Sequence, residues 1–311
     1  MYLLTMNRLD LLTKIYGGLH KYPGVPYWFL SPFRRLTRSV SNHIIPSYLS
    51  HTRKNRRNAV HSTPVIVSFT SFPARINNAW QVVECMLRQS YLPAKIILWL
   101  SKDQFATVES IPQSLREREG DLFEIRMVDG DIRSHKKYLY TFREFYGRLV
   151  LLIDDDLYYP TDLIERLLRE FQIGESSVIC NYGYEITYNE SSILPYMNWE
   201  KEYNYSTSPN LFFGSGGGTL IDTSKLNQIV QEIELALQLA PTADDIWLNA
   251  IVRYSGMKMT MLKNGSILPV YNEKNEKLST GNLGDSQNDI QLKNVMKYFS
   301  DNEGIELFSQ R

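Results

Sequence analysis

Three consecutive carboxylates, Asp154, Asp155 and Asp156, directly follow the apolar run 149–153. Five apolar residues in a row predict a central strand that is buried on both faces of a parallel sheet. Acids crowded at the mouth of such a strand repel one another and lose hydration, so they stay ionised only if a cation lies among them. Mg²⁺ and Mn²⁺ prefer oxygen ligands, and α/β proteins bind ligands at the carboxyl ends of their strands. The pattern predicts a divalent metal that handles a nucleotide diphosphate.

The triplet has an alternative interpretation as the cap of a helix that begins near Thr161. Negative charge is favoured at a helix start. A cap needs one acid, however, and the triplet lies several residues too early. The metal site is therefore the better interpretation.

Strands and helices are expected to alternate around the triplet. Asn78 and Gln81 resemble a capping box for an amphipathic helix that follows the first strand. Alternation at this spacing indicates βαβ units, so the expected fold is α/β with a mainly parallel sheet flanked by helices. The expected strands are 65–69, 94–100, 123–128, 149–153 and 177–180, with helices after residues 78 and 161 and over 103–119, 224–240 and 288–299.

Residues 181–210 have a different texture, with six tyrosines and Trp199 but no clean period. We expect long loops there whose flat rings stack on sugars, although for most of the tyrosines taken individually the packing of an irregular subdomain is the better interpretation. A glycine run follows at positions 214, 216, 217 and 218. Such a run lets backbone approach a ligand closely, but it lacks the spacing of a known phosphate-binding loop and is a weak signal by itself.

The composition fits one catalytic domain, 64–311, preceded by an extension, 1–63. The two cysteines, Cys85 and Cys180, have no metal or redox spacing, which favours a reducing compartment. No apolar run reaches the roughly 18 residues that span a bilayer, and Arg8, Asp10 and Lys14 interrupt any signal-peptide core. The expected location is cytoplasmic, with possible attachment to the inner face of the membrane.

The extension is strongly basic although the whole chain is neutral. Residues 1–63 hold ten Lys or Arg against Asp10, a net charge of +9 that leaves −9 for the rest. Basic groups beside aromatic residues suit an anionic membrane surface, and the apolar positions from Leu3 to Ile15 predict a helical face that lies in the interface. Deleting the extension should then lower vesicle binding and raise solubility. Nucleic acid is a rival partner without a supporting motif, and a solvated arm without a partner is the other alternative.

Several motifs together resemble the GT-A type nucleotide-sugar glycosyltransferases, in particular bacterial enzymes that build surface polysaccharides. The resemblance covers roughly residues 64–290. It rests on "VSFTSFPARI" at 67–76, "KKYLY" at 136–140, "LIDDDLYYP" at 152–160, "GSGGG" at 214–218 and "ADDIW" at 243–247.

The resemblance implies roles around the DXD motif. Asp156 would coordinate Mn²⁺ or Mg²⁺ directly, and Asp154 would be the second residue at the metal site, contacting ribose or a metal-bound water, with Asp155 between them. Lys137 would meet the phosphates, together with His135 or Lys136, unless this stretch is only a solvated basic turn.

Thr70, Ser71 and Arg75 would lie near the nucleotide, although ordinary turn chemistry before Pro73 also accounts for these residues. Asp245, with Asp244 as the alternative, would be the general base of an inverting enzyme, and a helix cap is the competing explanation. Some relatives use a late His as a further metal ligand. All five His of this chain precede the triplet, so Asn288, Asp289 or water would have to replace it.

The expected activity is therefore that of a metal-dependent glycosyltransferase of the hexosyltransferase type. It would move a sugar from a UDP-sugar to a saccharide or lipid-linked acceptor. A sugar nucleotidyltransferase and a non-enzymatic, membrane-docked saccharide-binding module are the alternatives.

Overall fold

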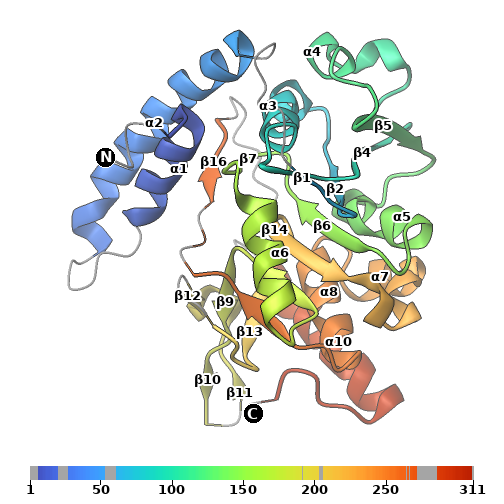
Figure 1. Ribbon diagram of the computed structural model, residues 1–311. Helices are drawn as coiled ribbons and strands as arrows, with labels where there is room; N and C mark the ends of the chain where they lie inside the picture. The colour runs from blue at the N-terminus through green and yellow to red at the C-terminus, as the bar shows by residue number, and fades with distance from the viewer. Residues whose placement is uncertain are drawn as a thin grey trace.

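A computed structural model describes residues 6–19, 27–52, 61–190, 192–202, 206–263, 265, 267–271 and 286–309. Its centre is a seven-stranded sheet with the order β15-β8-β14-β6-β2-β4-β5. β14 pairs antiparallel with both of its neighbours, and every other pair in this sheet is parallel. The α/β class with a mainly parallel sheet is confirmed (Figure 1).

The sheet strands agree closely with the apolar runs of the sequence, and two of them begin and end at the predicted residues. The seven strands are β2 (Ile66–Thr70), β4 (Lys95–Ser101), β5 (Phe123–Val128), β6 (Leu149–Ile153), β8 (Val178–Cys180), β14 (Gly217–Asp222) and β15 (Met259–Met261).

Helices cover both faces of this sheet. Side chains from α5 (Lys136–Glu144), α7 (Ile233–Leu239), α8 (Asp244–Tyr254) and α10 (Gln287–Glu303) share one apolar core with the face that includes Leu152. The core on the other face, which includes Leu151, takes side chains from α1 (Arg8–Gly18), α2 (Tyr27–His51), α3 (Ala79–Met86), α4 (Gln113–Arg116) and α6 (Leu163–Ile173).

Two predicted helices are broken into shorter pieces. The stretch 103–119 holds only η4 (Val108–Ser110) and α4, because Pro112 between them disfavours a continuous helix. The stretch 224–240 holds η7 (Thr223–Lys225), η8 (Gln228–Gln231) and α7. Asp222 and Asn227 accept backbone N–H bonds at the starts of η7 and η8, and such local bonds compete with a regular helix.

The tyrosine-rich segment was wrongly predicted to consist of long loops. It contributes β9 (Gly183–Glu185) and β12 (Glu200–Glu202) to a three-stranded antiparallel sheet with β13 (Leu211–Phe213). It also holds the hairpin β10 (Tyr188–Asn189) and β11 (Ser192–Ile193) and the short helix η6 (Tyr196–Asn198). Buried Trp199 stacks on Tyr196 in this sheet's core, so these two rings serve packing.

The N-terminal helices pack on the body of the molecule. Leu9 of α1 is fully buried, as are Ile45 and Leu49 of α2. The Asp10 carboxylate accepts bonds from the amide and the hydroxyl of Thr161, at 2.7 and 2.6 Å. Of the predicted apolar face of the first helix, Leu9 and Leu12 therefore pack on protein and Ile15 is exposed, while Leu3 and Leu4 lie outside the described residues.

The remaining elements connect these layers. The short strands form two further pairs, β1 (His61–Ser62) with β3 (Tyr91–Leu92) and β7 (Leu157–Tyr158) with β16 (Leu268–Pro269). The helices η3 (Ile76–Asn78) and η5 (Arg133–His135) lead into α3 and α5. Within the described ranges, none of the helices has the length and apolar character needed to span a bilayer.

Candidate active site

The Asp triplet leaves the sheet at the carboxyl end of β6, as predicted, and its three side chains differ in exposure. Asp155 is 5% exposed, whereas the side chains of Asp154 and Asp156 are 41% and 27% exposed. The Ser71 hydroxyl, which follows β2, donates to Asp155 Oδ2 at 2.5 Å. The middle carboxylate is thus an internal anchor, and the outer two remain open to solvent.

Arg75 neutralises part of this charge. Its Nη1 lies 2.9 Å from Asp156 Oδ2 and 3.3 Å from Asp155 Oδ1. Burial lowers the pKa of Arg75, but the three carboxylates outweigh it and the net shift is upward. Burial, followed by the charge of Asp155, raises the pKa of Asp156 to about 7 despite Arg75. A single arginine therefore leaves the triplet short of positive charge.

Lys137 joins the triplet to the late acidic pair. Its buried Nζ lies 3.0 Å from Asp154 Oδ1 and 3.0 Å from Asp244 Oδ2. Burial lowers the pKa of Lys137, but the charges of Asp154 and Asp244 dominate and raise it. Lys137 is thus a fixed bridge between a carboxylate at the end of β6 and a carboxylate at the start of α8. It is not a solvated turn residue.

Polar groups between the sheet and α5 fix the position of this lysine. The buried Ser68 hydroxyl of β2 lies 2.5 Å from the Lys137 carbonyl oxygen, to which it can donate, and 2.6 Å from Thr141 Oγ1. Trp99 Nε1 of β4 donates to the same Thr141 hydroxyl at 2.7 Å. No signal in the sequence identified this network, because each member falls inside an ordinary strand or helix pattern.

Asp244 and Asp245 begin α8 and have different environments. Ser215 donates through its hydroxyl to Asp244 at 3.0 Å and through its backbone N–H to Asp245 at 2.9 Å. Burial raises the pKa of Asp244, but the charge of Lys137 and other neighbouring groups outweighs the effect of burial. The net shift of this pKa is downward. For Asp245, burial and then the charge of Asp244 raise the pKa to about 6.

The glycine segment connects both carboxylate groups. A Cβ on Gly216 would lie 1.8–2.0 Å from the carboxylate atoms of Asp154, so any larger residue there would displace this side chain. The Asp154 backbone N–H donates to the Gly216 carbonyl oxygen at 3.0 Å, and the hydroxyl of buried Tyr159 donates to the same oxygen. The run that was a weak signal in the sequence is a structural part of this site.

Other predicted residues lie farther from the exposed carboxylates or serve packing. Thr70 donates to the Trp99 carbonyl oxygen at 2.8 Å, which ties β2 to β4. His135 is buried, its Nε2 lies 2.8 Å from the Ala240 carbonyl oxygen, and burial lowers its pKa. Lys136 pairs with Asp131. Asp289 accepts the Tyr196 N–H at 2.7 Å.

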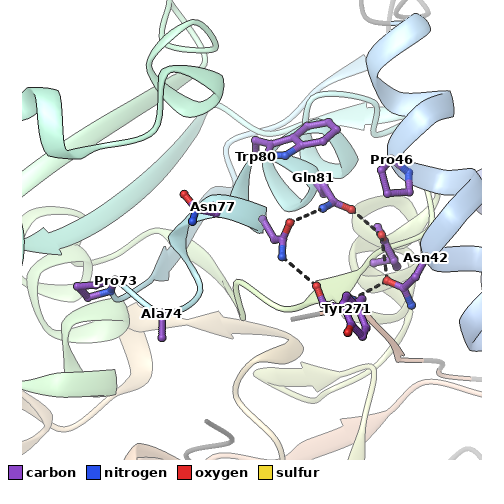
Figure 2. Close-up of a pocket in the computed structure, with 10 residues that line it drawn as sticks. Asn42, Pro46, Pro73, Ala74, Asn77, Trp80, Gln81 and Tyr271 are labelled. Atoms are coloured by element: carbon purple, nitrogen blue, oxygen red, sulfur yellow. Dashed lines mark hydrogen bonds between the residues drawn. The ribbon is translucent and has the colours of Figure 1, made fainter. Parts of the chain in front are cut away.

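A pocket of about 430 Å³ lies beside the loop that carries Arg75, between α2 and α3. A ring of hydrogen bonds crosses it (Figure 2). Asn42 of α2 accepts the Tyr271 N–H at 2.6 Å, and the Val270 N–H donates to the Asp156 carbonyl oxygen at 2.7 Å. In this ring Gln81 donates to Asn78, whose side chain makes no helix-capping bond, so the predicted capping box is wrong. The pocket wall thus links α2 to the triplet.

The donors at the triplet fit a hard divalent cation. Mg²⁺ is usually held by one or two carboxylates together with substrate phosphates, and Asp154 and Asp156 offer two partly exposed carboxylates. Nowhere in the described ranges do three or more His, Cys, Asp or Glu side chains form a ready metal cage. Any ion held here would need further ligands from substrate or water.

Comparison with known proteins identifies the family. The family model described as "Glycosyl transferase family 2" matches residues 74–230, just over half of the 311 residues. The chain belongs to glycosyl transferase family 2. This glycosyltransferase therefore has the GT-A type of fold that its motifs indicated, and the predicted enzyme class is confirmed. The matched region contains Arg75, Lys137, the Asp triplet and the glycine run.

Two solved structures are similar to this family 2 chain at low identity. One is a mannosyltransferase from Pyrobaculum calidifontis in complex with GDP-Man and Mn²⁺, which is 12% identical. The match covers 83% of this chain and 73% of the mannosyltransferase chain, with a TM-score of 0.42. The other is the inositol-1-phosphate CTP transferase from T. maritima, which is 11% identical. That match covers 78% of this chain and 98% of the transferase chain, with a TM-score of 0.38. Neither likeness is close enough to bear on function. A search of curated protein sequences finds no match.

Proposed function

We propose that this glycosyltransferase moves a sugar from a UDP-sugar to a saccharide or lipid-linked acceptor in surface polysaccharide synthesis, with inversion at the anomeric carbon. The observation that carries this proposal is the Lys137 bridge between Asp154 and Asp244. The bridge supports a single site, because it joins one proposed metal ligand to the acidic pair that includes the proposed base.

Asp156 and Asp154 are the proposed ligands of Mn²⁺ or Mg²⁺, with Asp155 as the buried anchor between them. When bound, the ion supplies positive charge that stabilises the diphosphate leaving group. Arg75 and Lys137 supply further fixed positive charge at the same place, because each already contacts two carboxylates. Thr70 and Ser71 hold the end of β2 against its neighbours and so shape the nucleotide side of the site.

Asp245 is the proposed general base. The carboxylate takes the proton of the acceptor hydroxyl while that oxygen forms a bond to the anomeric carbon and the bond from this carbon to the diphosphate breaks. A base works best when its pKa lies near the working pH, and the pKa of about 6 for Asp245 meets this requirement. Asp244 is the positioning residue, because Lys137 and Ser215 hold it in its ionised form.

The proposed setting is the cytoplasmic side of the cell membrane. We keep the predicted division into an extension, 1–63, and a catalytic domain, 64–311, with the basic extension next to an anionic membrane surface. A membrane would also present a lipid-linked acceptor directly to the enzyme.

The test is a panel of nucleotide-sugar donors read by release of the nucleoside diphosphate with Mn²⁺ present. We expect turnover with a UDP-sugar, its loss in EDTA, and its loss in Asp156→Asn with an unchanged circular dichroism spectrum. Unchanged turnover in Asp156→Asn would remove the metal role of this residue. Release of pyrophosphate from a nucleoside triphosphate would instead favour the nucleotidyltransferase, and the absence of any turnover would favour a binding module.

A further inference from the structure

The first four turns of α2 expose five large apolar side chains. We call Trp28, Phe29, Phe33, Leu36 and Val40 the α2 apolar face. Their exposure runs from 40% for Val40 to 73% for Trp28. The spacing of three and four residues places Phe29, Phe33, Leu36 and Val40 on the same side of the helix, and the Trp28 ring contacts the Phe29 ring. A contiguous apolar surface of this kind on an otherwise polar protein marks an interaction site.

The rest of the molecule holds this face outward. The opposite side of α2 buries Leu30, Ile45 and Leu49 in the core. Arg88 donates to the Leu49 carbonyl oxygen at 2.9 Å, and Asn42 donates to the Pro269 carbonyl oxygen at 3.1 Å. In Figure 1, α2 runs along the outer flank of the molecule beside α1. The helix is anchored through one side, so its exposed side is available to a partner.

The chemistry of the surroundings favours an anionic bilayer as this partner. α2 contains no Asp or Glu, and Arg35 and Arg38 are exposed in the same half of the helix as the apolar face. Trp28, Phe29 and Phe33 form a run of ring contacts, each 6.1 Å between centroids. Aromatic residues with flanking arginines are typical of helices that lie in the interface between headgroups and acyl chains. Each basic residue at an anionic surface adds on the order of 1 kcal/mol.

A second copy of the chain fits this face less well. A symmetric dimer uses the same patch on both subunits, so two copies of α2, which has basic but no acidic side chains, would face each other. Like charges at an interface oppose association.

We propose that the α2 apolar face inserts into the surface of an anionic bilayer, with Arg35 and Arg38 bound to lipid headgroups. This proposal deepens the membrane setting suggested above and rests on it for its biological purpose. It narrows the predicted membrane contact of basic and aromatic residues to α2 and leaves out the predicted helical face near the N-terminus, whose Leu9 is buried.

Docking through α2 would also orient the active site. Asn42 holds the backbone of Tyr271, whose neighbour Val270 donates to the carbonyl oxygen of Asp156. The helix that rests on the bilayer is therefore connected by two hydrogen bonds to the proposed metal-binding loop. A lipid-linked acceptor in the same bilayer would meet the site at a defined height.

The test is cosedimentation of the full-length chain with vesicles of phosphatidylcholine alone or mixed equally with phosphatidylglycerol. We expect binding to the mixed vesicles only, a blue shift of Trp28 fluorescence on binding, and its absence in Trp28→Phe. Phe29→Ser/Phe33→Ser/Leu36→Ser should lower the affinity at least about tenfold. Arg35→Ala/Arg38→Ala should also lower it, by an amount that shrinks as salt increases.

The matched control is Val108→Ser/Ile173→Ser/Met197→Ser, which removes three exposed apolar side chains elsewhere on the surface. Circular dichroism checks that each variant folds. The proposal is overturned if the wild type does not bind mixed vesicles, if the control loses as much affinity as the α2 variant, or if the α2 variant instead abolishes a dimer seen by sedimentation. Donor turnover with a soluble acceptor and no vesicles tests the catalytic proposal separately.

Discussion

At the scale of single residues, the site separates two adjacent carboxylates by their surroundings. Asp244 is paired with Lys137 and Ser215, and its pKa falls. Asp245 accepts the Ser215 N–H, and burial and then the charge of Asp244 raise its pKa to about 6. Two neighbouring acids whose pKa values move in opposite directions are typical of sites where one acid stays ionised and the other exchanges a proton.

The pKa of Asp245 predicts a pH profile. If Asp245 is the base, kcat/KM should rise as the pH passes through about 6, because the carboxylate must lose its proton first. Asp245→Asn should lower kcat by about 10²–10⁴-fold, the usual contribution of a general base. Initial rates of the wild type and of Asp245→Asn, measured in buffers from about pH 5 to pH 8, give the pH dependence of kcat/KM and the loss of kcat.

Asp245→Asn should raise the stability of the protein although it lowers its activity. A raised carboxyl pKa means that the folded state binds the proton more tightly than the unfolded state does, so ionising Asp245 costs stability as the pH rises from the ordinary value of 3.8 to about 6. Asp245→Asn should therefore be more stable than the wild type at neutral pH. A less stable but fully active variant would show that Asp245 has a structural role instead.

Gly216→Ala tests the close contact with Asp154. Because the added Cβ would lie within 2.0 Å of the carboxylate, that side chain must move away from Lys137. We expect Mn²⁺-dependent binding of UDP to weaken at least about tenfold, which isothermal calorimetry measures. Gly120→Ala is the control, because a Cβ there meets open space. Equal binding by both variants would contradict the assigned contact.

At the scale of elements, the site lies where strand ends and helix starts meet. The ends of β2 and β6 supply Arg75 and the triplet, and the starts of α5 and α8 supply Lys137 and the acidic pair. The position of α5 depends on a buried polar cluster of Ser68, Trp99 and Thr141. Such clusters are costly when incomplete, because a buried donor without an acceptor loses its hydration without replacement.

Thr141→Val tests this cluster. The change keeps the shape of the side chain but leaves Trp99 Nε1 without its acceptor, so the free energy of unfolding should fall by about 1–3 kcal/mol. Urea unfolding followed by fluorescence measures this difference. Ser192→Ala, which removes one exposed hydrogen bond, should change stability by less than about 0.5 kcal/mol. A neutral Thr141→Val would mean that α5 is held by apolar packing alone.

At the scale of the whole molecule, the N-terminal helices are part of the packed structure. Leu9, Ile45 and Leu49 are buried, and Asp10 and Asn42 bond to backbone more than a hundred residues away. This arrangement changes the expected result of deleting residues 1–63. The sequence predicted a more soluble remainder, whereas the structure indicates that deletion uncovers apolar surface on α3 and β16.

The truncated chain should therefore have a lower melting temperature and should aggregate more readily than the full chain. Differential scanning fluorimetry and light scattering measure the two effects. The triple α2 variant serves as control, because it removes exposed apolar groups without uncovering the core. A truncated chain that melts at the temperature of the full chain would show that the helices add no stability.

Ligand binding should also stabilise the whole molecule. A ligand at about a hundred times its Kd stabilises the folded state by about 2.7 kcal/mol. Mn²⁺ together with UDP should thus raise the melting temperature, and Asp156→Asn should remove the increase. A shift of equal size in the variant would place the ion elsewhere.

The sequence by itself determined five of the seven strands of the central sheet and the position of the Asp triplet, because an unbroken apolar run specifies a buried strand and the first polar residues after it must lie at the sheet edge. It also indicated Lys137, Arg75 and the late acidic pair as candidates. The tertiary structure decided which of these residues meet. Lys137 reaches both Asp154 and Asp244 only because α5 and α8 start at the same edge of the sheet, and no local pattern encodes such a contact. It also showed that the glycine run packs against Asp154, that the tyrosine-rich segment pairs as strands, and that the exposed apolar face belongs to α2. Each of these depends on burial against distant parts of the chain, and the period of a single segment cannot reveal which of its faces the rest of the molecule covers.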